Sequence, residues 1–223
     1  MNQKIITIDG PAASGKSSLS RELARKLGWS WISTGAFYRA LGLVAHKESI
    51  DLDDSNALLK ALNQYKIEVL PHKFQTQVCV DGQMCTPEEI YSEENGGRAS
   101  ALSRHQPVRD AVLELQRDCY KEPGLIAEGR DCGTVVFPNA QLKIFLEADT
   151  TSRAIRRGDQ DKISQEDLGK MQKSLEQRDK QASTRKSAPL VKATDSWVLD
   201  TSKLSLDEVS TKAFEKAKEI FSL

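Results

Sequence analysis

The chain has 223 residues, of which 39% are hydrophobic and 29% are charged, a composition typical of an ordered globular protein and not of a disordered one. Lysine plus arginine number 32 and aspartate plus glutamate also number 32, so the chain lacks the excess positive charge of a general binder of nucleic acid polymers. No apolar stretch approaches membrane-spanning length and the first residues lack a secretory signal, so we expect a cytoplasmic protein that does not associate with membranes.

The order of the predicted elements indicates an α/β fold. A β-branched run at residues 5–8 predicts a buried strand, and leucines at every fourth position after Ser17 predict a helix that ends at Gly28. Further strands are expected at residues 29–32, 125–127, 142–146 and 197–199, and further helices at 37–45, 58–62, 98–121, 164–181 and 205–221. Strands that alternate with helices form a mainly parallel sheet covered on both faces.

Two helix starts and one insertion have their own signals. Ser205 with Glu208 is a capping box, and Ser164 with Asp167 is a weaker capping-box-like start. Residues 65–86 alternate apolar and polar side chains around an Asp-Gly turn, which predicts a small antiparallel hairpin inserted in the chain.

The strongest motif fits the G-x-x-x-x-G-K-[S/T] pattern of a phosphate loop, between a predicted strand and a predicted helix. Its residues, followed by Ser18, are Gly10, Pro11, Ala12, Ala13, Ser14, Gly15, Lys16 and Ser17. The glycines let main-chain N–H groups turn toward phosphate oxygens, and the helix N-terminus adds partial positive charge. We expect Lys16 to reach the terminal phosphates of ATP and the Ser17 hydroxyl to ligate Mg²⁺.

A phosphate loop alone indicates nucleotide binding and leaves the reaction open. A switch GTPase is disfavoured because the chain has no Asn-Lys-x-Asp element, and an ATP-driven motor because it has no clear apolar run ending in Asp-Glu. A dehydrogenase-like domain is excluded because the loop lacks G-x-G-x-x-G spacing. A kinase of a phosphorylated acceptor would need arginines that clamp a second phosphate, and the candidates are Arg39, Arg109, Arg130, Arg178 and Arg185.

Several motifs together resemble the bacterial cytidylate kinases, which are P-loop nucleoside monophosphate kinases. They are the phosphate loop, residues 33–39 (Ser-Thr-Gly-Ala-Phe-Tyr-Arg), the specific run at 129–138 (Gly-Arg-Asp-Cys-Gly-Thr-Val-Val-Phe-Pro) and the Ala-Pro-Leu-Val segment at 188–191. The resemblance extends from the first strand to the last helix. It implies a monomer that uses ATP and Mg²⁺ to convert CMP and dCMP to CDP and dCDP.

The resemblance also implies residue roles. Thr34, Ser100 and Arg109 would contact the cytosine base, and Asp131 the base or the sugar. Arg39, Arg130, Arg178 and Arg185 would bind the acceptor phosphate, and Glu128 would hold Mg²⁺ together with Ser17. Arg157, which we favour over Arg156, would act from a short lid on the transferred phosphoryl group, so that the catalytic set is Lys16, Arg130, Arg157 and Arg178.

The implied organisation is a P-loop core of residues 1–35 and 107–223, with the lid at about 157–164. An acceptor-binding subdomain would span 36–106 and include the hairpin. The chain departs from the family at Ala182, where an aspartate associated with the sugar is usual. We therefore expect weaker discrimination by sugar hydroxyls unless a neighbour such as Asp179 substitutes. Cys132 is expected to be a packed small side chain and not a reactive thiol.

Two other functions remain open at this point. One is a P-loop kinase of a different small acceptor, such as another nucleotide or shikimate. The other is a non-catalytic module that changes shape with nucleotide and binds a partner. A panel of acceptors in a coupled assay separates the two kinases, and the module predicts tight nucleotide binding without acceptor-dependent turnover.

Overall fold

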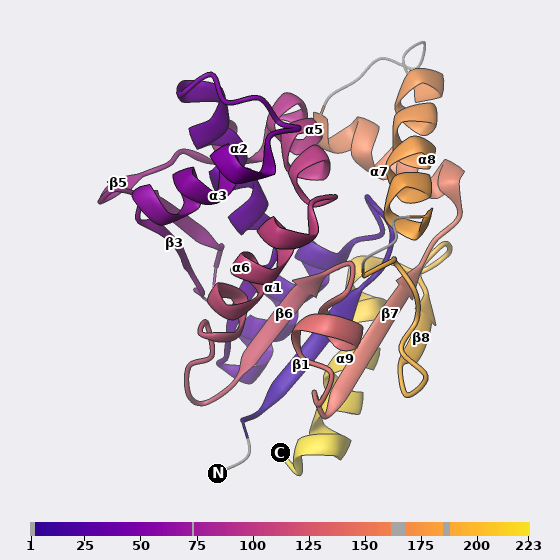
Figure 1. Cartoon of the computed structure of the whole chain (residues 1–223). Coiled ribbons are helices and arrows are strands. Elements are labelled where there is room, and N and C mark those ends of the chain that lie inside the picture. Colours follow the sequence, from indigo (N-terminus) through magenta and orange to yellow (C-terminus); the bar gives the residue numbers. More distant parts are fainter. Residues whose placement is uncertain (1–2, 73, 162–167, 185–187) are drawn as a thin grey trace.

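The centre of the molecule is a parallel five-stranded sheet, shown in Figure 1. The computed structural model describes residues 3–72, 74–161, 168–184 and 188–223. The strand order is β2-β6-β1-β7-β8, and all four pairings are parallel. The strands are β1 (Ile5–Asp9), β2 (Ser30–Ser33), β6 (Leu125–Gly129), β7 (Leu142–Glu147) and β8 (Trp197–Asp200).

Helices cover both faces of this sheet, so its central strands are buried on both sides as a parallel sheet requires. On one face, α1 (Lys16–Leu27) and α9 (Leu206–Phe221) pack against side chains such as Ile8 and Ile144. On the other face, α2 (Gly35–Lys47) and α6 (Gln106–Arg117) pack with Ala127 and a one-turn π-helix, η1 (Cys132–Val136). The predicted α/β class is therefore confirmed.

The predicted hairpin insertion is confirmed as a separate antiparallel sheet. Its strands are β3 (Ile67–Leu70), β4 (Gln77–Val80) and β5 (Gln83–Met84). Asp81 and Gly82 join β4 to β5 with φ values of 50° and 79°, the left-handed conformation that a tight hairpin turn needs. A bridge between Trp31 and His72 ties this insertion to β2 at the edge of the main sheet.

The remaining helices lie above the carboxyl ends of the central strands (Figure 1). One group is α3 (Ser55–Gln64), α4 (Pro87–Tyr91) and α5 (Glu93–Leu102), and the other is the pair α7 (Thr150–Asp161) and α8 (Leu168–Thr184). None of the helices in the described ranges is long and apolar enough to cross a membrane.

Several predicted boundaries differ from the structure. The helix expected at 98–121 is two helices, because Pro107 sits in the first turn of α6 and the preceding residues leave the helical conformation. The capping box of Ser205 and Glu208 is confirmed at the start of α9. The weaker start at Ser164 and Asp167 lies outside the described residues.

Candidate active site

The phosphate loop turns between the end of β1 and the start of α1. Gly10 has a φ of 152°, and a Cβ there would lie 2.5 Å from the carbonyl oxygen of Leu146, so the chain can pass only as glycine. Gly15, with a φ of 92°, is the N-cap of α1 and supplies no side chain to its first N–H groups. No acidic residue occupies the first turn of α1. This helix end therefore presents main-chain donors to an anion.

Lys16 lies over the loop, and its ammonium donates to the carbonyl oxygen of Pro11 at 2.6 Å. Burial lowers the pKa of Lys16 to about 8, against the attraction of the Glu128 and Asp179 carboxylates, and Arg130 lowers it further. The charges of Glu128, Asp179 and Arg130 thus all act on the Lys16 ammonium.

The two predicted metal ligands are in contact. The Ser17 hydroxyl donates to Glu128 Oε1 at 2.9 Å, although the residues are 111 positions apart in sequence. Glu128 is buried on β6, the strand next to β1. Thr34 fixes this residue further, because its N–H and its hydroxyl both donate to the Glu128 carbonyl oxygen at 2.9 Å.

Asp9, the last residue of β1, was not among the predicted site residues, and it links the start of the phosphate loop to η1. Its two oxygens accept hydrogen bonds from the N–H groups of Cys132 at 2.8 Å and Gly133 at 2.7 Å. Burial raises the pKa of Asp9 to about 6, although both main-chain hydrogen bonds act to lower it. The carboxylate thereby fastens η1, which follows the Arg130-Asp131 pair, to the strand that leads into the phosphate loop.

Asp179 on α8 is a second acidic residue that sequence patterns missed as part of this cluster. It accepts from the Ala12 N–H at 3.0 Å and from Arg130 Nη1 at 3.1 Å, and it forms an ion pair with Arg153 of α7. Arg130 is therefore held beside the phosphate loop.

The other predicted acceptor residues have partners on neighbouring elements. Arg109 is buried and paired with Asp131. Arg39 donates to the carbonyl oxygens of Ile90 at 2.9 Å and Ser92 at 3.3 Å, at the end of α4. These arginines are thus anchored by protein oxygens.

Helix α5 meets α8 across the site. Arg178 pairs with Glu93 at 3.2 Å, and the Ser100 hydroxyl donates to Gln181 at 3.2 Å. Arg178 and Ser100, the predicted substrate-binding residues on these two helices, therefore both lie where α5 contacts α8.

Two predicted residues cannot be placed. The side chain of Arg157 and all of Arg185 lie outside the described residues. Arg156 donates to the Thr201 hydroxyl at 3.0 Å and to its carbonyl oxygen, which ties α7 to the end of β8. Cys132 is fully buried, as expected, and burial raises the pKa of its thiol well above the usual value.

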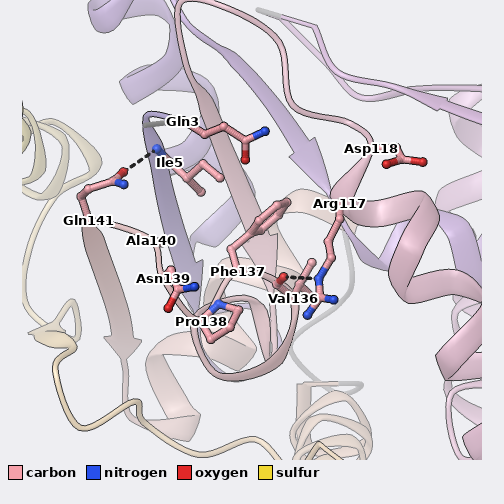
Figure 2. A pocket seen from close by; sticks show the side chains of 10 residues that line it. All are labelled: Gln3, Ile5, Arg117, Asp118, Val136, Phe137, Pro138, Asn139, Ala140 and Gln141. Carbon is pink, nitrogen blue, oxygen red and sulfur yellow. Dashed lines mark hydrogen bonds between the residues drawn. The ribbon is translucent and has the colours of Figure 1, made fainter. Parts of the chain in front are cut away.

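A separate hollow of about 730 Å³ opens near the amino end of β1, shown in Figure 2. Gln141 accepts there from the Ile5 N–H at 2.9 Å, and Arg117 donates to the Val136 carbonyl oxygen at 2.9 Å. The phosphate loop follows the opposite end of β1, and none of the predicted site residues lines the hollow. The predicted chemistry belongs to the other end of the sheet.

A phosphate loop and several arginines meet at the carboxyl edge of a parallel sheet, an arrangement that is typical of a P-loop phosphotransferase. The family model described as cytidylate kinase matches residues 6–219 of the chain. The chain belongs to the cytidylate kinase family, which confirms the resemblance that the sequence motifs indicated.

Individual relatives match the chain over nearly their whole lengths. The chain is 47% identical over 215 residues to a cytidylate kinase of Bdellovibrio bacteriovorus, with 96% of this chain and 97% of that one aligned. It is 40% identical over 213 residues to a cytidylate kinase of Cupriavidus pinatubonensis, with 95% and 94% aligned. The solved structure of an uncharacterized protein from Eubacterium ventriosum is 13% identical, with a TM-score of 0.53 and coverage of 98% and 99%, and shares the fold alone.

Proposed function

We propose that the protein transfers the γ-phosphoryl group of ATP to a phosphate oxygen of CMP or dCMP, which yields ADP and CDP or dCDP. Membership of the cytidylate kinase family supports this activity. The observation that carries the proposal is the position of Arg130 beside the phosphate loop, because Asp179 Oδ1 accepts both from Arg130 Nη1 at 3.1 Å and from the Ala12 N–H at 3.0 Å. A donor-side and an acceptor-side cation therefore share one site, and opposed phosphates could meet between them.

On the donor side, residues 10–18 surround the ATP phosphates and bind them through main-chain N–H groups, except at Pro11, which has none, and at Ala12, whose N–H donates to Asp179. Lys16 leaves the Pro11 carbonyl to follow the transferred group. The attacking oxygen of the acceptor phosphate is already ionised, so no general base is required. Catalysis then consists of alignment and charge neutralisation.

The Ser17–Glu128 pair fits a Mg²⁺ site, because a hydroxyl oxygen and a carboxylate within hydrogen-bond distance are hard ligands at the exit of a phosphate loop. Across the described residues no group of three acidic, histidine or cysteine side chains gathers around a possible metal. A Mg²⁺ ion that also takes phosphate and water oxygens needs no such group. When bound, the ion would neutralise charge on the ATP phosphates.

On the acceptor side, Arg39, Arg130 and Arg178 bind the phosphate of CMP, and Arg185 joins them. Thr34, Ser100, Arg109 and Asp131 hold the base and the sugar. Each of the phosphate-binding arginines that the structure describes lies against a carboxylate or a carbonyl oxygen, so its guanidinium group is held in place before an acceptor phosphate binds. Arg157 acts from the lid on the transferred group.

We further propose that residues 36–106 are the acceptor subdomain and that residues 157–164 are the lid. The proposed boundaries fall near the starts of α2 and α6, so the subdomain would consist of α2 to α5 and the hairpin sheet. The enzyme acts as a cytoplasmic monomer in this proposal.

An acceptor panel tests the function. Purified protein with ATP and Mg²⁺ is offered CMP, dCMP, UMP, AMP, GMP and shikimate, and ADP formation is followed by a coupled assay. We expect CMP and dCMP to give the highest kcat/KM. Preference for another acceptor would reassign the substrate, and nucleotide binding without acceptor-dependent turnover would favour the switch module.

A further inference from the structure

Four elements of the molecule meet on the carboxylate of Asp179. Oδ1 accepts from the Ala12 N–H of the phosphate loop at 3.0 Å and from Arg130, which follows β6, at 3.1 Å. Oδ2 pairs with Arg153 of α7, and Asp179 itself belongs to α8. The side chain of Asp179 is 18% exposed and that of Arg153 is 7% exposed, so solvent screens these contacts only in part.

The pair of Asp179 and Arg153 holds one residue of the phosphate loop from both sides. Asp179 accepts from the N–H of Ala12, and Arg153 Nη1 donates to its carbonyl oxygen at 3.0 Å. The main chain of Ala12 is therefore fixed by a charge pair that comes from outside the loop.

The same helices also pack on the loop through apolar side chains. Ala154 of α7 and Met171 and Leu175 of α8 form a small buried cluster, against which Ala12 and Ala13 are packed. Movement of the α7–α8 pair is consequently linked to movement of the loop, and Arg130 is linked to both through Asp179.

We propose that Asp179 is a positioning residue that fixes the phosphate loop and Arg130 relative to each other and to the α7–α8 pair. This inference rests on the proposed function, since Arg130 is there the acceptor-phosphate ligand. The carboxylate acts in this proposal through Ala12 and Arg130, which it contacts. It determines whether the phosphate loop and the Arg130 guanidinium group are both directed at the transferred phosphoryl group.

The variant Asp179→Asn keeps the size of the side chain and removes its charge. We expect kcat to fall about 10- to 100-fold, while KM for ATP and for CMP changes less than about threefold, because misalignment costs the transition state more than it costs ground-state binding. Asp179→Glu should not restore kcat, since an added methylene displaces the carboxylate. Glu176→Gln removes an equal charge from an exposed position on the same helix and should match the wild type.

A double-mutant cycle with Arg153→Gln separates positioning from general stability. If the two side chains act as one unit on Ala12, the double variant loses no more kcat than the worse single variant. A normal kcat in Asp179→Asn, additive losses, or a loss that only mirrors a smaller folded fraction in thermal melts would overturn the inference. If Asp179→Asn does not fold, Arg153→Gln must show the same division between kcat and KM. An inactive wild type would reject the proposed function instead.

Discussion

The donor and acceptor sides of the site are built from different materials. The donor side is main chain, and glycines with φ values of 152° and 92° shape it. The acceptor side is built from long side chains, and each described arginine rests on an oxygen of another element, as in the pairs Arg130–Asp179 and Arg178–Glu93. The cradle takes its shape mainly from its own backbone, with Ala12 also held by Asp179 and Arg153, whereas guanidinium groups depend wholly on neighbours to hold them.

This difference predicts which kinetic constant a substitution on each side should change. Changes in the donor cradle should lower the rate of the chemical step, because its contacts act on the group in transfer. Changes in the acceptor clamp should appear first in the KM for the acceptor. The predictions that follow test this contrast, from the largest expected effect to the smallest.

Lys16→Ala should break the donor side. We expect kcat to fall by about 10³-fold or more, because a single cation aimed at developing charge contributes on that order. Thermal melting should be close to that of the wild type. Arg21→Ala, which removes an exposed cation from the same helix, serves as the control and should retain full turnover. Near-normal kcat in Lys16→Ala would refute the site assignment.

Arg130→Lys should break the acceptor side while it preserves charge. A lysine cannot offer the planar fork of arginine to a phosphate, so we expect kcat/KM for CMP to fall about 10- to 100-fold. KM for ATP should stay within about threefold of the wild type. Steady-state kinetics with each substrate varied in turn provides the measurement. An equal loss for both substrates would contradict the division between the two sides.

The pH profile should distinguish the free site from the occupied one. Lys16 is active as the ammonium and its pKa is lowered to about 8, so kcat/KM for ATP should decline as the pH rises through 8, approaching tenfold per unit. Bound phosphates favour the charged lysine, so the decline in kcat should begin at a higher pH. Profiles from pH 6 to 10 measure both limbs, and a kcat/KM that is flat to pH 9.5 would disprove the assignment.

The smallest effect concerns the sugar of the acceptor. Ala182 is buried on α8, and both oxygens of Asp179 are engaged by Ala12, Arg130 and Arg153. Asp179 is therefore a poor substitute for the missing carboxylate, and we expect kcat/KM for CMP and dCMP to agree within a few-fold. Ala182→Asp should shift that ratio toward CMP. Identical ratios in both proteins would eliminate the idea.

The donor side was predictable because its signal is local. A strand, a glycine-rich turn and a helix lie within residues 5–27, and the same sequence fixes the backbone and the ligands. The pairing of Ser17 with Glu128 was expected from the resemblance, and the structure brings the two together.

The supporting contacts were not predictable, because they join residues far apart in sequence. Asp9 reaches Cys132 over 123 positions, and Asp179 reaches Ala12 over 167. No periodicity or spacing marks such pairs. An aspartate at the end of the strand before a phosphate loop was the one available signal for Asp9.

The two halves of the specific run at 129–138 lie at different places in the structure, which the sequence alone does not show. Arg130 and Asp131 face the site, where Asp179 and Arg109 bind them. Val136, Phe137 and Pro138 line the hollow at the other end of the sheet (Figure 2). The second half of the motif thus serves packing around η1, and only its first half carries the proposed chemistry.

The central claim is that two anionic substrates are bound end to end between the phosphate loop and the arginines. The most direct test is the affinity of an adenosine–cytidine pentaphosphate, measured by calorimetry beside ATP and CMP. The account predicts a Kd at least about 100-fold below that of either nucleotide, with competition against both, because one molecule fills both sides. Binding no tighter than ATP alone, or competition with only one substrate, would contradict it.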